Sequence, residues 1–209
     1  MILIFNLSVM YLLHRMCQVS YGSRLYKVYC FFYITNLYTF PGIYDEIIVT
    51  GLLARGLFMI EIKAVEKDSE LAEKLLRYVE ECSWDDCKDH IAYMIRDWVF
   101  TDWETMFVAI CGDDIVGMAS IMKTDYYPLP EIYPWISCVF VSEEHRGNRI
   151  SGQLIDYANQ YAKSQGFEKS YIPSEFMGLY EKYGYVYVRD IVNYGDGVDH
   201  LFEKRLETE

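Results

Sequence analysis

The segment that most constrains the fold is the stretch from His145 to Leu154, with the sequence HRGNRISGQL. It follows an apolar run, Ile136 to Val141, that predicts a buried strand, and it leads into apolar residues at helical spacing. A strand that turns into a helix here aims the unpaired N–H groups of the first helical turn, and the positive end of the helix dipole, at one point. Such a point binds anions, so the stretch predicts a phosphate site.

The residues of this turn are mostly small or basic. The candidate phosphate ligands are Arg146, Gly147, Asn148, Arg149, Ile150, Ser151 and Gly152. Small residues let the backbone come close to an anion, and the two arginines add positive charge. The alternative interpretation is an ordinary helix start with two solvated arginines.

The run VFVSEEHRG, Val139 to Gly147, resembles the start of the pyrophosphate loop in the GNAT superfamily of acyl-CoA-dependent N-acyltransferases. That loop is usually written Arg or Gln, x, x, Gly, x, Gly or Ala. Here Arg149 stands where the family usually has its second glycine, and Ser151 where it has its third small residue. Because backbone N–H groups make the contacts of this loop, we expect both side chains to be tolerated as long as φ stays negative.

A second motif lies downstream. The run FMGLYEKYGY, Phe176 to Tyr185, resembles the GNAT segment in which a short helix bearing Tyr-Glu-Lys-x-Gly-aromatic turns into a strand. The resemblance covers roughly Met59 to Leu206. It implies an α/β (α+β) fold with a mixed, mostly antiparallel central sheet flanked by helices, preceded here by an atypical N-terminal extension.

The periodicity of the chain predicts the same order of elements. The expected elements are a strand at 59–64, a helix capped by Asp68 or Ser69, a helix with Ile91, Met94, Ile95 and Trp98 on one face, a hairpin turning at 112–114, a helix from Ile150 to about Gln165, and strands at 169–173, 185–192 and 198–206.

The resemblance also implies a cosubstrate, acetyl-CoA, and a direct attack of the amine on its thioester. The backbone of Val139, Phe140 and Val141 would align the pantetheine and offer an N–H to the thioester oxygen, and the turn from Arg146 to Gly152 would hold the pyrophosphate. Binding energy from that remote anchor serves positioning. Cys138, close to the acyl group, is interpreted as a strand residue.

Two residues are candidates for catalysis. Tyr180 occupies the family's acid position, and a phenol of pKa ~10 can protonate a thiolate whose conjugate thiol has a pKa near ~8.5. Glu131, in an acid-x-x-Pro-Trp sequence ahead of the central strand, is the candidate for binding or deprotonating the amine. The alternatives are that Tyr180 is one more core aromatic among 20 tyrosines and that Glu131 is a plain loop carboxylate.

The composition of the chain limits the classes of molecule that the protein is expected to bind. A net charge of −12 disfavours general affinity for nucleic acid or an anionic membrane, and favours cationic amines, either small molecules or peptides. The six cysteines show no zinc-ligand spacing, so we expect no metal and interpret them as reduced thiols of a cytoplasmic protein. A homodimer is compatible with these features.

Residues 1–58 differ from the rest. They carry four bases and two acids, a net charge of +2. Because the whole chain has a net charge of −12, residues 59–209 have a net charge of −14. Their apolar runs are too short or too interrupted to predict a spanning helix, which needs ~20 apolar residues. We interpret 1–58 as upstream sequence with a mis-assigned start, or as a disordered segment, and 59–209 as the GNAT domain.

The sequence therefore predicts an N-acetyltransferase that acts on a primary amine of a small molecule or peptide. Two alternatives stay open. One is a non-catalytic acyl-CoA-binding module, suggested by the two loop departures and by Ser137, which stands at a strand position that is often acidic in the family. The other is a membrane-associated protein that uses residues 1–58.

Overall fold

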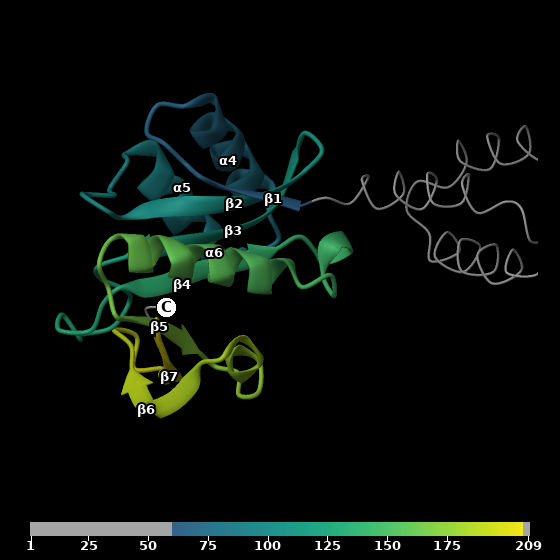
Figure 1. The fold of residues 1–209 in the computed structure, drawn as a ribbon. Helices are drawn as coiled ribbons and strands as arrows, with labels where there is room; N and C mark the ends of the chain where they lie inside the picture. Colours follow the sequence, from purple (N-terminus) through teal and green to yellow (C-terminus); the bar gives the residue numbers. More distant parts are fainter. Residues whose placement is uncertain (1–59, 207–209) are drawn as a thin grey trace, which may run out of the picture. The chain divides into compact units, whose positions relative to one another are not determined.

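A computed structural model describes residues 60–206. Its elements form one seven-stranded sheet with helices (Figure 1), in the strand order β1-β2-β3-β4-β5-β7-β6. The strands are β1 (Ile60–Ala64), β2 (Thr105–Cys111), β3 (Asp114–Met122), β4 (Trp135–Val141), β5 (Lys169–Ser174), β6 (Val186–Val192) and β7 (Val198–Arg205). The helices are α4 (Glu70–Glu81), α5 (Lys88–Arg96) and α6 (Ile150–Ser164), with short 3-10 helices η2 (Glu143–His145) and η3 (Tyr180–Tyr183).

The sheet is mixed and mostly antiparallel, which confirms the fold class predicted from the sequence. Every neighbouring pair of strands runs antiparallel except β4 and β5, which are parallel. Most of the predicted elements are present within one or two residues of their expected bounds. One detail was wrong: Trp98 lies beyond α5, which ends at Arg96, so it is not on the face of that helix.

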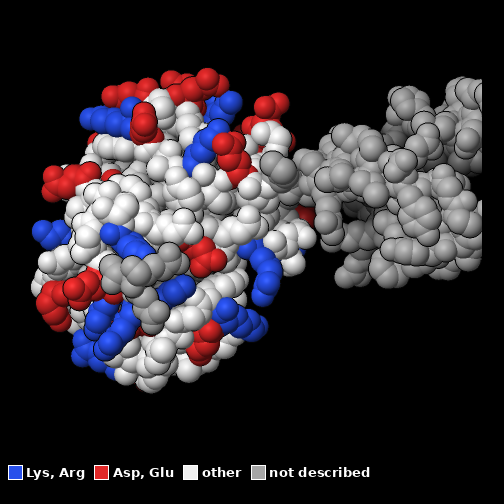
Figure 2. Space-filling model, in the orientation of Figure 1, with Lys and Arg blue, Asp and Glu red and all other residues white. Residues whose placement is uncertain are grey.

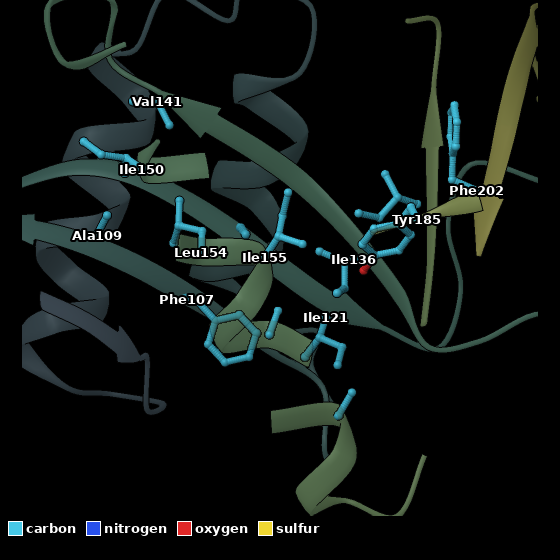
Figure 3. Close-up of a cluster of buried hydrophobic side chains, with 14 of the residues drawn as sticks. Phe107, Ala109, Ile121, Ile136, Val141, Ile150, Leu154, Ile155, Tyr185 and Phe202 are labelled. Carbon is cyan, nitrogen blue, oxygen red and sulfur yellow. The ribbon is translucent and has the colours of Figure 1, made fainter. Parts of the chain in front are cut away.

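The two faces of the sheet carry different helices (Figure 1). Side chains alternate along β2, so that Met106 and Val108 pack with α4 and α5, whereas Phe107 and Ala109 pack with α6. Figure 3 shows the second cluster, in which Leu154 and Ile155 of α6 lie over the sheet, and both side chains are fully buried. Burial on both faces fixes the central strands in place.

The helix α4 begins as its sequence predicts. The side chain of Ser69 accepts a hydrogen bond of 3.1 Å from the N–H of Ala72, and Glu70 and Glu73 lie in the first turn, at the positive end of the dipole. Leu75 and Val79 are fully buried under this helix. An N-cap of this kind contributes about 1 kcal/mol, and burial of the apolar face contributes more.

The sheet opens between β4 and β5. The two parallel strands share a single paired position, Trp135 with Tyr171, at the start of β4. In β4 the register against β3 shifts after Ser137, and Cys138 adopts a φ of 52°, which marks a β-bulge. Beyond Trp135 the edge of β4 that faces β5 therefore forms no ladder with any described residue, so its backbone groups are available to another partner.

Within residues 60–206 no helix is both long and apolar enough to cross a membrane. The interpretations of residues 1–58, including the membrane alternative, concern a segment outside the described residues.

Candidate active site

The turn between β4 and α6 presents a run of free donors. Within the described chain, the backbone N–H groups of residues 147 to 152 donate no hydrogen bond, whereas the N–H of Arg146 bonds to the carbonyl of Glu143 at 3.2 Å. Gly147 has a φ of 78° and Arg149 a φ of 60°, so the chain bends sharply at both residues. Successive N–H groups in such a bend, at the start of a fifteen-residue helix, form an anion-binding nest.

The backbone of Arg149 contradicts one expectation. A negative φ was expected at this residue, but it adopts the left-handed backbone conformation, which glycine adopts without strain. This explains in physical terms why similar loops have a glycine here. The side chain of Arg149 is exposed, and within the described residues it makes no ion pair, so its charge is available to an anion.

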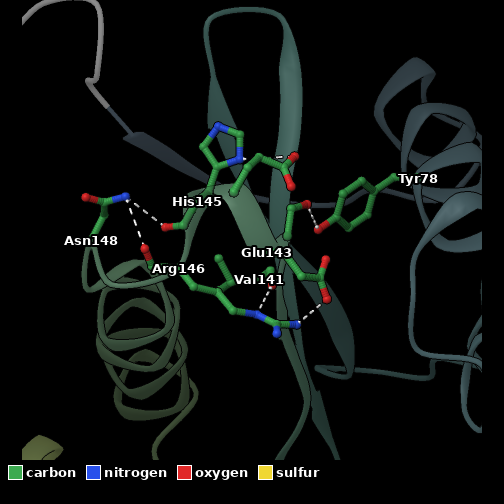
Figure 4. A network of polar contacts seen from close by, with 8 residues as sticks. Tyr78, Val141, Glu143, His145, Arg146 and Asn148 are labelled. Atoms are coloured by element: carbon green, nitrogen blue, oxygen red, sulfur yellow. Dashed lines mark hydrogen bonds and ion pairs between the residues drawn. The ribbon is translucent and has the colours of Figure 1, made fainter. Parts of the chain in front are cut away.

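Arg146 turns back on β4 instead of projecting from the turn (Figure 4). Its Nε donates to the carbonyl of Val141 at 2.9 Å, its guanidinium pairs with Glu143 at 2.7 Å, and it lies 5.5 Å from the ring centroid of Phe140. The amide of Asn148 donates to the carbonyl of His145 at 3.0 Å. These side chains hold the shape of the turn, and the cradle itself is made of backbone.

A second set of contacts joins the turn to α4. The hydroxyl groups of Tyr78 and Ser142 share a hydrogen bond of 2.8 Å, and burial raises the pKa of Tyr78 to about 12. The hydroxyl of Ser83, just beyond α4, donates to Glu143 at 2.6 Å. That bond, with the charge of Arg146 nearby, holds the pKa of Glu143 below its usual value. Residues of α4 and the residues just after it thus stabilise the turn.

The three residues predicted to align the pantetheine lie at the end of β4. Val139 and Val141 face α6, and Phe140 faces the opposite side, where its ring stacks on Trp84 at 5.9 Å. On the other edge of the strand, Phe140 and Val141 pair with β3. The open edge between β4 and β5 therefore leads directly to the nest.

Tyr180 lies in η3, which packs against the start of α6. Its ring is 6.5 Å from that of Tyr183 and 5.9 Å from that of Phe202, and the Tyr183 hydroxyl is 3.0 Å from the Ser151 hydroxyl. Within residues 60–206 the hydroxyl of Tyr180 has no hydrogen-bond partner. Burial raises the pKa of Tyr180 to about 12, so this phenol is a weaker acid than an ordinary tyrosine.

Glu131 lies apart from these groups. It is exposed in a turn of the loop 123–134, ahead of the start of β4, whereas the nest follows the end of β4. A seven-residue strand spans about 20 Å. The structure places Tyr180 beside the turn between β4 and α6, and within residues 60–206 no hydrogen bond or ion pair joins Glu131 to either of them, so the role of Glu131 stays a prediction.

One residue was missed by the sequence analysis. Asp125, in the same loop, accepts a hydrogen bond from the hydroxyl of Ser137, and its other oxygen accepts the N–H of Tyr126 at 2.5 Å. Ser137 is the position where an acid was expected and absent. The contact joins residues 12 apart in the chain, across a loop with no regular period, so only the unexplained serine hinted at it.

Cys138 sits at the bulge beside Ser137. Burial raises the pKa of its thiol to about 12, so the thiol stays protonated at neutral pH and is a poor nucleophile. This supports its interpretation as a strand residue. Within residues 60–206 no group of His, Cys, Asp or Glu is arranged to hold a metal ion.

A mixed sheet that opens beside a helix start with free N–H groups defines an α/β protein whose strand edge can hold a phosphate-bearing ligand. A sequence model described as the acetyltransferase (GNAT) family matches residues 69–185, which is more than half of the chain. The chain therefore belongs to this family of acetyltransferases. No match was found among curated protein sequences.

Solved structures agree on the fold. An aminoglycoside 6'-N-acetyltransferase complexed with coenzyme A is 16% identical with a TM-score of 0.55, covering 71% of this chain and 98% of that one. The aminoglycoside 6'-N-acetyltransferase from Enterococcus faecium is 15% identical with a TM-score of 0.55, covering 71% and 98%. A putative GNAT acetyltransferase from Desulfovibrio desulfuricans is 10% identical with a TM-score of 0.55, covering 71% and 100%. At these identities the likeness concerns the fold alone.

Proposed function

We propose that this protein transfers an acetyl group from acetyl-CoA to a primary amine of a small molecule or peptide, by direct attack of the amine on the thioester. The observation that carries the proposal is the run of N–H groups at residues 147–152, which donate no hydrogen bond in the described part of the chain and follow the open edge of β4. A pyrophosphate bound in the nest would leave the rest of acetyl-CoA to extend along the open edge of β4. Membership of an acetyltransferase family and the coenzyme A bound to a structural neighbour support the choice of ligand.

The chemistry then needs a neutral amine, a polarised thioester carbonyl and a proton for the leaving thiolate. The backbone of Val139, Phe140 and Val141 supplies the donor to the carbonyl oxygen. Tyr180 supplies the proton: burial disfavours the phenolate, but it disfavours a neighbouring thiolate as well, so the two groups stay close in proton affinity when both are enclosed. Glu131 is the sequence-based candidate for the amine.

The composition of the chain indicates the charge of the acceptor and the compartment in which the reaction takes place. The excess of acids attracts a cationic acceptor by long-range electrostatics. Among the residues that the structure describes, Cys82, Cys87 and Cys138 form no disulfide, which fits a reducing compartment such as the cytoplasm.

A charge reversal in the nest tests the cofactor site. Arg149→Glu places a negative charge beside the bound pyrophosphate, and we expect the affinity for acetyl-CoA, measured by titration calorimetry, to fall at least about tenfold. Arg189→Glu is the matched control, because this exposed arginine of β6 undergoes the same change of charge away from the turn. Equal affinities for the two variants would move the pyrophosphate to another part of the protein.

Transfer is tested separately, by release of free thiol from acetyl-CoA over a panel of primary amines: putrescine, spermidine, kanamycin and a lysine-containing peptide. Binding of acetyl-CoA with thiol release for at least one amine supports the enzyme. Binding without release from any of them would support the non-catalytic acyl-CoA-binding module instead.

A further inference from the structure

Asp125 is a half-buried acid whose carboxyl group is held by uncharged donors. Its contacts are the hydroxyl of Ser137 and the N–H of Tyr126, and within residues 60–206 no lysine or arginine forms an ion pair with it. A carboxylate removed from water is normally paired with a cation or hydrogen-bonded on all sides. A single hydroxyl and a single N–H leave acceptor sites of a charged carboxylate unused.

The position of this carboxyl group suits the reacting end of the site. Ser137, which holds it, directly precedes the bulge of β4, where the sheet opens toward β5. Cys138 packs toward α4 and α5, and the charge of Asp125 acts on the thiols of Cys138 and Cys87, the latter at the start of α5. Asp125 therefore lies on the α5 side of the opening, partway along β4 from the nest.

The groups around Asp125 make the region negative. Burial is the main cause that raises the pKa of Asp125, the bond from Ser137 lowers it, and the charges of Asp199 on β7 and His90 on α5 respectively raise and lower it. Asp199 accepts a bond of 2.7 Å from the Tyr127 hydroxyl. The N–H of Tyr194 bonds to the carbonyl of Tyr126 at 3.1 Å, which joins the β6–β7 turn to this loop.

We propose that Asp125, positioned by Ser137, receives the ammonium group of the acceptor and removes its proton before the attack. This rests on the proposed acetyltransferase function and assigns the amine to Asp125 in place of Glu131. It also narrows the acceptor to amines that are protonated in solution, because a cation complements a half-buried carboxylate beside other acids. The rings of Tyr126, next to Asp125, and Tyr194 pack edge to face with their centroids 5.8 Å apart, and an exposed ring face of this pair can contact a cation.

The protons balance. The ammonium gives one proton to the Asp125 carboxylate, and the neutral nitrogen forms a bond to the thioester carbon. When the C–S bond breaks, the thiolate takes one proton from Tyr180, and the nitrogen loses its second proton, which restores Tyr180 directly or through solvent. Asp125 then releases its proton to solvent, so that the products are the amide, coenzyme A as free thiol, and one proton.

The test compares Asp125→Asn with Asp113→Asn, the same change at an exposed acid of the β2–β3 turn. With the amine of the panel that the wild type acetylates best, we expect Asp125→Asn to lower kcat/KM about 10²-fold and to remove the acidic limb of its pH profile, while Asp113→Asn changes neither. In calorimetry with coenzyme A present, Asp125→Asn should also bind that amine at least about tenfold more weakly. Its affinity for acetyl-CoA should be unchanged.

A second variant keeps the proposal testable if Asp125→Asn does not fold. Ser137→Ala removes a bond that lowers the pKa of Asp125, so the acidic limb should move to higher pH without disappearing. A structural role for the serine alone would lower the rate at all pH values without moving the limb, and would count against the proposal.

The possible failures are distinguishable. If the wild type acetylates an amine and Asp125→Asn does so with the same rate and pH profile, Asp125 has no such role and the acetyltransferase function stands. If Glu131→Gln, instead of Asp125→Asn, loses the acidic limb, Glu131 is the residue that binds and deprotonates the amine. If the wild type binds acetyl-CoA and acetylates nothing in the panel, both proposals fail together.

Discussion

Arg149 carries backbone strain in the middle of the nest. A non-glycine residue with φ near 60° costs about 1–3 kcal/mol, and this conformation aims the surrounding N–H groups at one point. The strain is therefore borne where it shapes the anion site, and the side chain adds a positive charge that a glycine could not provide. Arginine rarely adopts a left-handed backbone, so the residue itself did not reveal this conformation, and the hint in the sequence was that the family usually has glycine here.

Tyr180 is the residue on which the chemistry of the thiolate depends. We expect Tyr180→Phe to keep the fold and the affinity for acetyl-CoA but to lower kcat by about 10² or more, the usual effect of losing an acid. Because its hydroxyl makes no hydrogen bond within the described residues, the change removes no bond in that part of the chain. Stopped-flow and steady-state thiol release measure kcat, and calorimetry measures the affinity.

The control for Tyr180 is Tyr157→Phe. Tyr157, on α6, is another half-buried ring, with its centroid 5.4 Å from that of Phe107, and loss of its hydroxyl should leave kcat unchanged. Normal turnover by Tyr180→Phe would show that the proton comes from water or from another residue.

At the scale of elements, α6 is set against η3 through a glycine. A Cβ built on Gly152 would lie 2.8 Å from Cε1 of Tyr183, closer than packed atoms approach, so the first turn of α6 accepts this ring only because residue 152 lacks a side chain. That contact holds η3, and with it Tyr180, beside the nest. Gly152 therefore serves both the backbone cradle and the placement of the acid.

A double-mutant cycle measures this contact. Gly152→Ala gains about 1 kcal/mol of helix propensity but must displace the Tyr183 ring, which costs about 1–3 kcal/mol, so we expect a net loss of up to about 2 kcal/mol in the free energy of unfolding. In a Tyr183→Ala background the clash is absent, and the same substitution should stabilise the protein by about 1 kcal/mol. Denaturant unfolding gives all four values. Equal effects in both backgrounds would show that the ring and the helix do not constrain one another.

The elements of this fold were largely predictable, and the site only in part. Period-two and helical patterns, the cap at Ser69 and the turn at 112–114 depend on neighbours in sequence, which a sequence displays directly. The nest was predictable because strand, turn and helix are consecutive. The pair of Asp125 and Ser137 was not, because it depends on how a loop with prolines at 128 and 130 folds back over β4.

At the scale of the whole molecule, charge is unevenly distributed. Figure 2 shows acidic side chains gathered at the top of the described domain, over α4, and many Lys and Arg side chains lower on the same face. The exposed acids of α4 include Glu70, Glu73, Glu80 and Glu81. With −14 on residues 59–209, the domain attracts cations at low salt, and the attraction weakens as the Debye length falls to about 8 Å at physiological ionic strength.

The last prediction concerns how much of the chain this fold needs. All the strands and helices described, both family motifs and Asp125 lie between Ile60 and Leu206, and β1 joins the sheet along its whole length, from Ile60 to Ala64. We therefore expect a chain of residues 59–209 to be soluble and folded, and to bind acetyl-CoA with the affinity of the full chain.

The matched control for this truncation removes only a little more. A chain of residues 66–209 lacks β1, so it exposes the edge of β2 and opens one side of the cluster under α6, where Ile60, Ile62 and Ala64 pack. We expect this shorter chain to aggregate or to unfold at a clearly lower temperature, because three partly buried apolar side chains and a strand ladder are lost. Thermal unfolding followed by circular dichroism, with calorimetry for acetyl-CoA, compares the three chains. A chain of residues 59–209 that aggregates while the full chain stays soluble would show that residues 1–58 contribute to the folded domain.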